Sequence, residues 1–429
     1  MRILIYLTLL LPIFTFSQCF TLVGCELITT YSIKQDGTLW AWGNGVNLGT
    51  DQNYPLQLGT ATNWIDVSGR AALKNDGTLW YFYSPNGTFS QIENDANWQS
   101  FSSRNGYTMA IKNNNTLWAR GANNYGQLGD GTTVNKTNFI QIGSNDWAKI
   151  YAGANSCFAI KFDGTLWAWG LNYYGQLGDG TTINKLIPTQ IGTDTDWNSV
   201  SICMAGHTLA LKNNGTLWAW GNNNLGQLGN GTFGGINGMP MQVGIATDWA
   251  KIASNRYASF ALKQNGTLWS WGGGAIYTLG DGSTSSRNIP AQVGSDTNWS
   301  KINTGLEFTT AIKTNNTLWV WGYNSSGQLG IGTNISQNFP VQVSCFPLNT
   351  NQFNKDNFTL YPNPTKQFLN IENTNIPITK MVVIDMLGKK VVEQNDAALQ
   401  IDVSQLQNGL YVLQVYSENG VFSYKFVKE

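Results

Sequence analysis

The chain has 429 residues, equal numbers of basic and acidic side chains (25 each), and a charged fraction of 12%. That fraction is about half of the usual share. A neutral chain without a basic patch lacks the attraction to phosphate that dominates nucleic-acid affinity, so we exclude nucleic acid as a partner. The 47 glycines indicate many turns, and the 18 tryptophans form an unusually large set of aromatic side chains.

The N-terminal segment has the pattern of a signal peptide, which we predict over residues 1–17. Met1 and Arg2 precede an apolar run, and polar residues follow it. The run is shorter than the ~20 residues of a spanning helix, so we expect no stable membrane span. A lipoprotein anchor on Cys19 is disfavoured, because Gln18 occupies the place of the small residue that should precede the modified cysteine. We expect export, with the mature chain either soluble or attached to the cell surface.

Most of the chain repeats one segment, which is seen most clearly at Lys161–Thr182. The core of the segment, Thr-Leu-Trp, occurs seven times and ends at Trp40, Trp80, Trp118, Trp167, Trp218, Trp269 and Trp319. Each core follows Ala/Ser-Ile/Leu-Lys and a short turn such as Asp-Gly, which indicates a tight β-hairpin. Another tryptophan lies upstream in six copies, and Phe20 takes its place in the first. Tryptophans at a fixed place in every repeat favour packing over sugar binding.

The spacing of the repeats predicts a β-propeller. Successive cores lie 38 to 51 residues apart, with several short strands and glycine-rich turns in each period. We therefore predict an all-β chain with a seven-bladed propeller over residues 18–345 and a small C-terminal β-sandwich. The core followed by Asn-x-x-Gly-Gln-Leu-Gly resembles the regulator of chromosome condensation repeat, in the copies at Asn123–Gly129, Asn172–Gly178, Asn223–Gly229 and Asn324–Gly330. This resemblance also implies seven blades.

Five cysteines in an exported chain raise the question of disulfides. Cys157 and Cys203 lie in strand-like runs and are expected to be buried free thiols. When the two ends of the repeat region are superimposed on an ordinary junction between repeats, Cys345 and Cys19 fall three residues apart. We predict a Cys19–Cys345 disulfide that closes the ring, with Cys25 as the alternative partner of Cys345.

The first three repeats depart most from the pattern, and we call them the irregular sector. The first two lack the full Gly-Gln-Leu-Gly loop, and the third has an arginine in place of its second tryptophan. Such departures mark either drift or function. Because aromatic residues and arginine dominate binding hot spots, the candidate contact residues of this sector are Tyr81, Tyr83, Phe89, Arg104 and Arg120.

The C-terminal region has a different composition. Residues 346–357 are expected to form a linker, and residues 358–429 contain short alternating runs that predict a β-sandwich. The segments Leu360–Pro364, Asp385–Lys389 and Leu406–Tyr411 resemble the C-terminal sorting domain of the type IX secretion pathway. That resemblance implies transport across the outer membrane by this secretion machinery, usually with removal of the tail. An adhesive sandwich domain is the alternative.

Groups for catalysis are few. His207 is the only histidine, which disfavours a zinc site, and its glycine-flanked place in the repeat favours a structural role. The acids of the Asp-Gly turns are expected to bond local backbone. We therefore predict no catalytic residue, no bound metal and no cofactor. A polysaccharide-acting enzyme would need paired carboxylates, for which Glu93 and Asp95 are the nearest acidic pair in the irregular sector.

The function predicted from these features is non-catalytic binding. An exported propeller would use its loops to engage an extracellular protein or glycan. Relatives in the resembled family show that the fold constrains function loosely, since one exchanges nucleotide on a nuclear GTPase and another is a secreted inhibitor of β-lactamases. The nuclear role does not suit an exported chain without a basic tail. A secreted enzyme and a structural or adhesion role at the cell surface are the alternatives.

Overall fold

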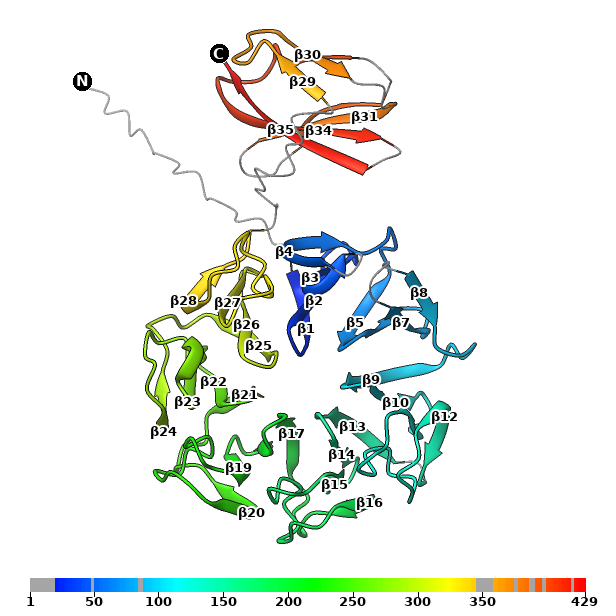
Figure 1. Cartoon of the computed structure of the whole chain (residues 1–429), viewed down its shortest axis with the longest axis vertical. Coiled ribbons are helices and arrows are strands. Elements are labelled where there is room, and N and C mark those ends of the chain that lie inside the picture. Colours follow the sequence, from blue (N-terminus) through cyan, green and yellow to red (C-terminus); the bar gives the residue numbers. More distant parts are fainter. Residues whose placement is uncertain are drawn as a thin grey trace, which may run out of the picture. The chain divides into compact units, whose positions relative to one another are not determined.

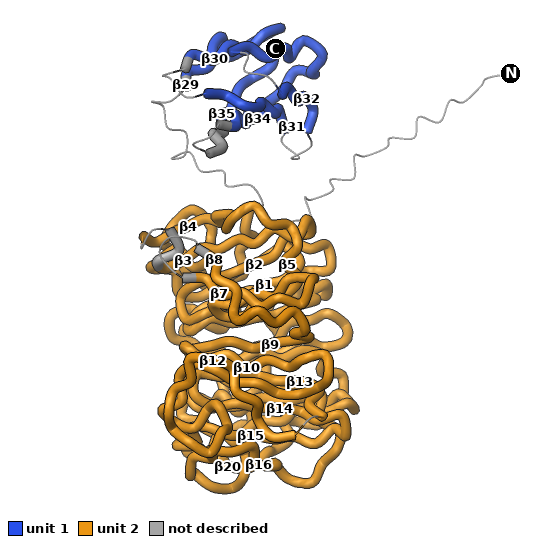
Figure 2. Tube along the Cα trace, turned by 90° about the vertical axis from the view of Figure 1, so that its right-hand side faces the viewer, with its two compact units in different colours: residues 1–18, 346–429 blue, residues 19–345 orange. Residues whose placement is uncertain are grey.

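The computed structural model describes residues 20–47, 50–83, 88–144, 146–344, 358–373, 377–385, 390–395, 399–417 and 420–429. They belong to two compact units, one within residues 19–345 and one within residues 346–429 (Figure 2). The predicted signal peptide, the predicted linker and both cysteines of the predicted disulfide lie outside the described residues. Among the described residues, no helix has the length and apolar character needed to cross a membrane.

The first unit is a ring of seven blades, each a four-stranded antiparallel sheet made of consecutive strands (Figure 1). Blades 1 and 2 contain β1 (Phe20–Glu26), β2 (Thr29–Lys34), β3 (Leu39–Asn47), β4 (Thr50–Gln57), β5 (Trp64–Ser68), β6 (Ala71–Lys74), β7 (Leu79–Tyr83) and β8 (Thr88–Gln91). Blades 3 and 4 contain β9 (Trp98–Arg104), β10 (Tyr107–Lys112), β11 (Leu117–Gly121), β12 (Lys136–Ile142), β13 (Trp147–Ala152), β14 (Ser156–Lys161), β15 (Leu166–Gly170) and β16 (Lys185–Gln190).

The remaining blades follow the same order. Blades 5 to 7 contain β17 (Trp197–Ile202), β18 (His207–Lys212), β19 (Leu217–Asn222), β20 (Ile236–Gln242), β21 (Trp249–Ser254), β22 (Ala258–Lys263), β23 (Leu268–Gly272), the short helix η1 (Ala275–Tyr277), β24 (Arg287–Gln292), β25 (Trp299–Thr304), β26 (Phe308–Lys313), β27 (Leu318–Gly322) and β28 (Gln337–Gln342). In each blade the first strand is innermost and the fourth is outermost. The seven-bladed propeller predicted from the sequence is therefore confirmed.

A local hydrogen-bond motif explains why Thr-Leu-Trp recurs. In blade 1, the Asp36 carboxylate accepts hydrogen bonds from the backbone N and the hydroxyl of Thr38, whose oxygen accepts from Trp40 Nε1 at 2.8 Å. The other six blades repeat this arrangement with Asp or Asn at the turn. The turn acids bond local groups, as the sequence predicted.

The repeated lysine at the end of each second strand packs on two aromatic rings. In blade 7, Lys313 Nζ lies 3.9 Å from the ring centroid of Trp319 and 4.6 Å from that of Trp299. The equivalent lysines of the other blades, Lys34, Lys74, Lys112, Lys161, Lys212 and Lys263, lie in the same way over their own ring pairs. Cation–π attraction thus joins the first and third strands at one end of every blade.

The ring closes between blades 7 and 1 by packing and hydrogen bonds. Phe20 and Trp42 of blade 1 share a buried cluster with Phe308 and Val343 of blade 7. Across the same junction, Gly332 N donates to Asn53 O at 2.6 Å, and Thr30 Oγ1 donates to Gln328 O at 2.8 Å. Among the described residues neither blade lends a strand to the other, and the contacts seen across this junction are side-chain packing and hydrogen bonds of the loops.

The three cysteines within the described residues are buried free thiols. For Cys157 and Cys203 this confirms the prediction. Cys25, the alternative disulfide partner, lies in the closing junction with its Sγ 3.9 Å from Thr310 Oγ1. Burial raises the pKa of the Cys25 thiol to about 12.

The second unit is a small β-sandwich. One sheet contains β29 (Phe358–Tyr361), β30 (Phe368–Asn373) and β33 (Gln400–Asp402), and the other contains β32 (Lys390–Gln394), β31 (Ile378–Asp385), β34 (Gly409–Ser417) and β35 (Gly420–Lys428). Leu369 and Ile401 of the first sheet share a buried cluster with Met381, Leu413 and Phe426 of the second. Strand order and core agree with the small β domain expected from the sequence.

Candidate functional site

The Gly-Gln-Leu-Gly loop of one blade receives a tryptophan of the next. Trp220 of blade 5 is fully buried, and its Nε1 donates to Gln176 O in the loop of blade 4 at 2.7 Å. Gly178 has φ +84°, and a Cβ there would lie 2.8 Å from Trp220 Nε1, so only glycine fits. Trp169, Trp271 and Trp321 donate to the preceding loops in the same way. We call this arrangement the tryptophan lock.

The lock extends to the outer strands. Gly180 N, in the loop of blade 4, donates to Gly238 O on the fourth strand of blade 5 at 2.8 Å. Equivalent bonds join blades 3 and 4, 5 and 6, 6 and 7, and 7 and 1. Trp42 occupies the equivalent place at the closing junction, where a Cβ on Gly330 would lie 2.6 Å from its Nε1, but this Nε1 is buried without a hydrogen-bond partner among the described groups.

The two junctions without a lock are those of the irregular sector. Blades 1 and 2 lack the full loop, and the blades that follow them lack the second tryptophan. Phe82 replaces it in blade 2 and packs on Tyr31 and Phe89, with ring centroids 5.3 and 5.6 Å away. Arg120 replaces it in blade 3, with its guanidinium 5.9 Å from the centroid of Phe139. Where one blade lacks the Gly-Gln-Leu-Gly loop, the next blade therefore also lacks the second tryptophan.

The predicted contact residues do not form one patch. Phe89 belongs to the core, stacked on Trp64 at 5.4 Å. Tyr81 is half-buried against the cluster between blades 2 and 3, and Phe139, which lies under Arg120, is part of the same cluster. The structure thus brings Tyr81 and Arg120 to one junction and separates Phe89 from them. The side chain of Tyr83 lies outside the described residues.

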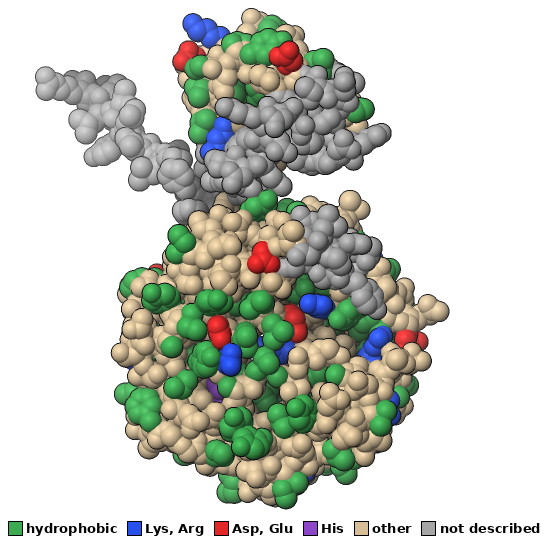
Figure 3. Space-filling model, viewed as in Figure 1, with side chains coloured by type: hydrophobic (Ala, Val, Ile, Leu, Met, Phe, Trp, Pro, Cys, Tyr) green, Lys and Arg blue, Asp and Glu red, His purple; other side chains and the backbone are tan. Residues whose placement is uncertain are grey.

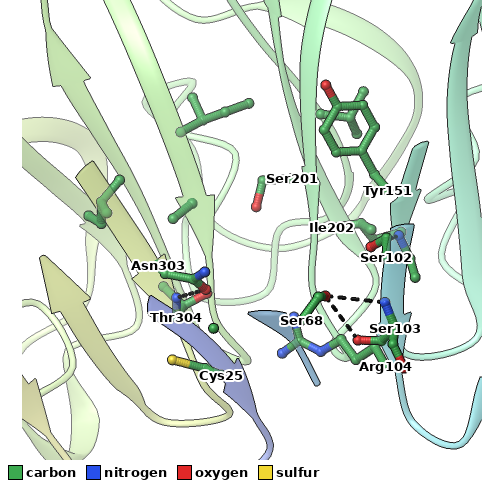
Figure 4. Close-up of a pocket in the computed structure, with 16 residues that line it drawn as sticks. Cys25, Ser68, Ser102, Ser103, Arg104, Tyr151, Ser201, Ile202, Asn303 and Thr304 are labelled. Atoms are coloured by element: carbon green, nitrogen blue, oxygen red, sulfur yellow. Dashed lines mark hydrogen bonds between the residues drawn. The ribbon is translucent and has the colours of Figure 1, made fainter. Parts of the chain in front are cut away.

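Arg104 lies instead in the central channel. It lines a cavity of about 210 Å³, together with the fifth residue of the inner strand of every blade. Figure 4 shows Arg104 beside Ser68 and Ser103, whose backbone and side-chain groups bond each other. Nε and Nη2 of Arg104 are buried without a hydrogen-bond partner among the described groups. Burial raises the pKa of the nearby Glu26, and the charge of Arg104 opposes that shift.

The loops between third and fourth strands carry exposed apolar side chains. Tyr173 and Ile183 in blade 4 are 67% and 68% exposed, and Val134, Phe233 and Ile335 hold comparable positions in the loops of blades 3, 5 and 7. These loops lie on the same face as the turns between first and second strands, because the strands of a blade alternate in direction. Figure 3 shows one face of the ring, with hydrophobic side chains over much of it and charged groups near its centre.

Buried asparagines hold these loops in one shape. Asn172 Nδ2 donates to Asp179 Oδ1 and to the carbonyl oxygens of Thr181 and Ile183, and its Oδ1 accepts from Leu177 N. Asn123, Asn223 and Asn324 make matching bonds in blades 3, 5 and 7. Exposed apolar groups on ordered loops lose little freedom on binding, which favours affinity.

His207 is part of a buried chain of hydrogen bonds between blades 5 and 6. Ser259 Oγ donates to Gln227 O at 2.7 Å, so it accepts from His207 Nε2 at 3.0 Å. The other ring nitrogen, Nδ1, then accepts from the Cys203 thiol at 3.0 Å. Burial lowers the pKa of His207 to about 3, so the ring is neutral. All three side chains are buried, which favours a structural role.

The acidic pair considered for catalysis is engaged in structural contacts. Glu93 Oε1 accepts from Phe139 N at 2.6 Å, and Asp95 pairs with Lys112 at 2.6 Å. Within the described residues, no group of three or more histidine, cysteine or acidic side chains could hold a metal ion.

Sequence reasoning missed the exposed apolar positions of the loops. The signal was present, since Thr-Thr-Val at Val134 and Thr-Thr-Ile at Ile183 repeat an apolar residue inside a polar loop. It also missed three lysines of the inner strands, Lys149, Lys251 and Lys301, which occupy the same place in blades 4, 6 and 7.

The first unit is a propeller of seven repeat-built sheets, and loop and tryptophan interlock at five of its seven junctions. A separate β-sandwich follows it in the chain. The regulator of chromosome condensation (RCC1) repeat model matches residues 114–160, 163–211, 265–312 and 315–353. A second model of this repeat matches residues 147–176, 205–227 and 299–328. The secretion system C-terminal sorting domain matches residues 359–429. The chain therefore carries regulator of chromosome condensation repeats followed by a type IX secretion sorting domain.

Curated relatives match short segments. The mitochondrial RCC1 domain-containing protein RUG3 of Arabidopsis thaliana is 35% identical over 88 residues, which cover 20% of each chain. The E3 ubiquitin-protein ligase HERC2 of Homo sapiens is 35% identical over 78 residues, 18% of this chain and 2% of that protein. The matches thus span a fifth or less of these relatives' lengths.

Solved structures share the fold. Yeast RCC1 (Prp20), solved with Kap60, has a TM-score of 0.63 at 16% identity, covering 81% of this chain and 88% of that one. Human WBSCR16 has a TM-score of 0.57 at 20% identity, covering 76% and 82%. At these identities the likeness concerns the propeller itself.

Proposed function

We propose that this chain is an exported, non-catalytic binding protein whose loop face engages an extracellular protein or glycan. The observation that carries the proposal is the row of exposed apolar side chains on ordered loops, exemplified by Tyr173 and Ile183. A rigid scaffold with adaptable loops is a common basis for recognition. One protein of similar fold, yeast RCC1, was solved bound to Kap60, which is a precedent for a protein partner.

The sorting domain supports the route of export. Type IX secretion would deliver the propeller to the cell surface or to the medium, through contacts of residues 358–429 with the secretion machinery. The predicted signal peptide would supply the first step, across the inner membrane. The ligand would then be met outside the cell.

The test is a glycan array and a pull-down of secreted proteins with the purified mature chain. A Tyr173→Ala/Ile183→Ala variant removes two exposed side chains of the blade 4 loop, and a Tyr81→Ala/Arg120→Ala variant changes the irregular sector. We expect a ligand whose binding is lost in the first variant and retained in the second. Loss only in the second would move the site to blades 2 and 3. A wild-type chain that captures neither glycan nor protein would contradict the proposal.

A further inference from the structure

The central channel has a cationic layer near one end. The inner strand of every blade begins with an aromatic residue, Phe20 in blade 1 and a tryptophan in the others. Counted from this residue, the third residues of the seven inner strands are Leu22, Asp66, Ser100, Lys149, Ser199, Lys251 and Lys301. Residues three and five of a strand point to the same side, and the fifth residues line the channel cavity. The third residues therefore face the channel one layer away, about 7 Å closer to the strand starts.

The positive charges of this layer are only partly compensated. Asp66 is the one acid in the layer, and its Oδ1 accepts from Val67 N. Lys149 bonds Asn198, and Lys301 donates to Thr21 O. The side chain of Lys251 makes no hydrogen bond or ion pair with any described residue. Burial lowers the pKa of Lys149, and the charge of Lys251 lowers it further.

Four acids on the same face of the ring pair with lysines outside the channel layer. Asp194 and Asp196 pair with Lys212, while Asp248 pairs with Lys263. Asp296 pairs in the same way with Lys313. These partners are the lysines of the tryptophan pairs, so the acids are not free to neutralise the channel lysines.

A cavity opens beside two of the channel lysines. Its volume is about 330 Å³, and Lys251 and Lys301 line it together with Leu22, Ile252, Ile302 and Ile312. That volume is at the small end of the usual range for ligand pockets, ~300–1,000 Å³. Asn303 and Thr310 also line the cavity. Largely aliphatic walls that include two lysines match a ligand that has one anionic group and a compact apolar body.

We propose that this end of the channel binds a small amphipathic anion, such as an aromatic carboxylate. The lysines would meet the carboxylate, and the aliphatic walls would cover the ring. The site lies at the opposite end of the blades from the loop face, because inner strands begin where the outer strands end. It is therefore separate from the proposed macromolecular surface, and the two proposals are tested independently.

Four probes separate charge from apolar contact. Isothermal titration of the mature chain with phenylacetate should give measurable binding, since this probe has both features. Phenylacetamide keeps the ring without the charge, and acetate and inorganic phosphate keep the charge without the ring. We expect each of these three to bind at least about tenfold more weakly. Equal binding of phenylacetamide, acetate or phosphate would overturn the proposal.

Variants locate the site. Lys251→Gln/Lys301→Gln keeps the aliphatic wall, removes both charges and should weaken phenylacetate binding at least about tenfold. The control, Lys136→Gln/Lys185→Gln, removes the same charge from the outer strands β12 and β16, where these lysines pair with Asp130 and Asp179. It should bind like the wild type. Equal binding by both folded variants, or no binding by the wild type, would refute the site.

Discussion

The locked and unlocked junctions of the ring differ in one paired feature. Five junctions, from blades 3 and 4 round to blades 7 and 1, combine a Gly-Gln-Leu-Gly or related loop with a buried tryptophan of the next blade. At the other two, Phe82 and Arg120 stand where the tryptophan would be, and no such loop precedes them. The tryptophan is useful only where a loop covers it, because an uncovered indole would leave a large apolar surface exposed to water.

This difference changes how the irregular sector is understood. Its unusual residues have a structural reason, since loss of a loop in one blade removes the need for tryptophan in the next. Phe89 fills space beside Phe82, and Arg120 covers Phe139. Departure from a repeat therefore needs to be assessed across a junction, not within a single copy.

The largest loss of unfolding free energy is expected at a locked junction, and a substitution at an unlocked junction provides the comparison. Trp220→Ala should lower the free energy of unfolding by about 3–5 kcal/mol, because it empties a fully buried site and breaks the bond to Gln176 O. Arg120→Ala, at the equivalent place in blade 3, should cost less than about 1 kcal/mol. Urea unfolding of both variants measures the difference. Similar losses of unfolding free energy in the two variants would mean that the lock adds no stability to its junction.

The closing junction has a lock and, by prediction, a covalent bond as well. A Cys19–Cys345 disulfide would close a loop of over 300 residues and could add up to about 4–5 kcal/mol by restricting the unfolded chain. Non-reducing peptide mapping of the mature protein should find the linked peptides, and Cys345→Ser should lower the melting temperature only under oxidising conditions. Free thiols at both positions would show that packing alone closes the ring.

Acid should weaken the junction between blades 5 and 6. The His207 pKa is near 6.5 in the unfolded chain and about 3 in the fold, so the unfolded state binds the proton first as pH falls. Stability is then lost below pH 6.5, by about 3 kcal/mol at pH 4. In His207→Gln, urea unfolding between pH 7 and 4 should show a smaller decline than in the wild type. Parallel declines would assign the acid sensitivity to carboxylates.

The smallest effect tests whether tryptophan alone can restore a lock. Phe82→Trp places the larger side chain in blade 2, where Tyr31 and Phe89 already fill the space and no loop receives it. Overpacking should cost about 1–3 kcal/mol. Thermal unfolding of this variant, beside Trp220→Phe at a locked junction, provides the measurement. A gain in stability for Phe82→Trp would show that the loop is not required.

The blades were predictable because the repeat carries its own local chemistry. Asx turn, threonine and tryptophan bond one another within a few residues, so each copy specifies its hairpin independently, as Asp36, Thr38 and Trp40 illustrate. The C-terminal sandwich followed from short alternating strands in the same way. The propeller hairpins therefore rest on interactions that are close in sequence, whereas the sandwich also pairs strands that are distant in the chain, β30 with β33 and β31 with β34.

The candidate sites were less predictable because they depend on contacts between copies. Arg104 was singled out for its residue type, and only the ring places it in the channel. The channel lysines lie about 50 residues apart or more, and their common layer becomes visible once the strand register is known. Exposure of Tyr173 likewise follows from loop packing, which a single repeat does not reveal.

Each blade of this propeller is a continuous stretch of chain, since blades 1 and 7 keep their strands separate. A genetic duplication or deletion of one repeat would therefore add or remove a whole sheet without splitting another. A circular permutant that begins at Trp98 would likewise leave every sheet intact, provided that a linker joins Ser344 to Phe20. Recombination between repeats could therefore change the number of blades, or the blade with which the chain begins, without dividing a sheet.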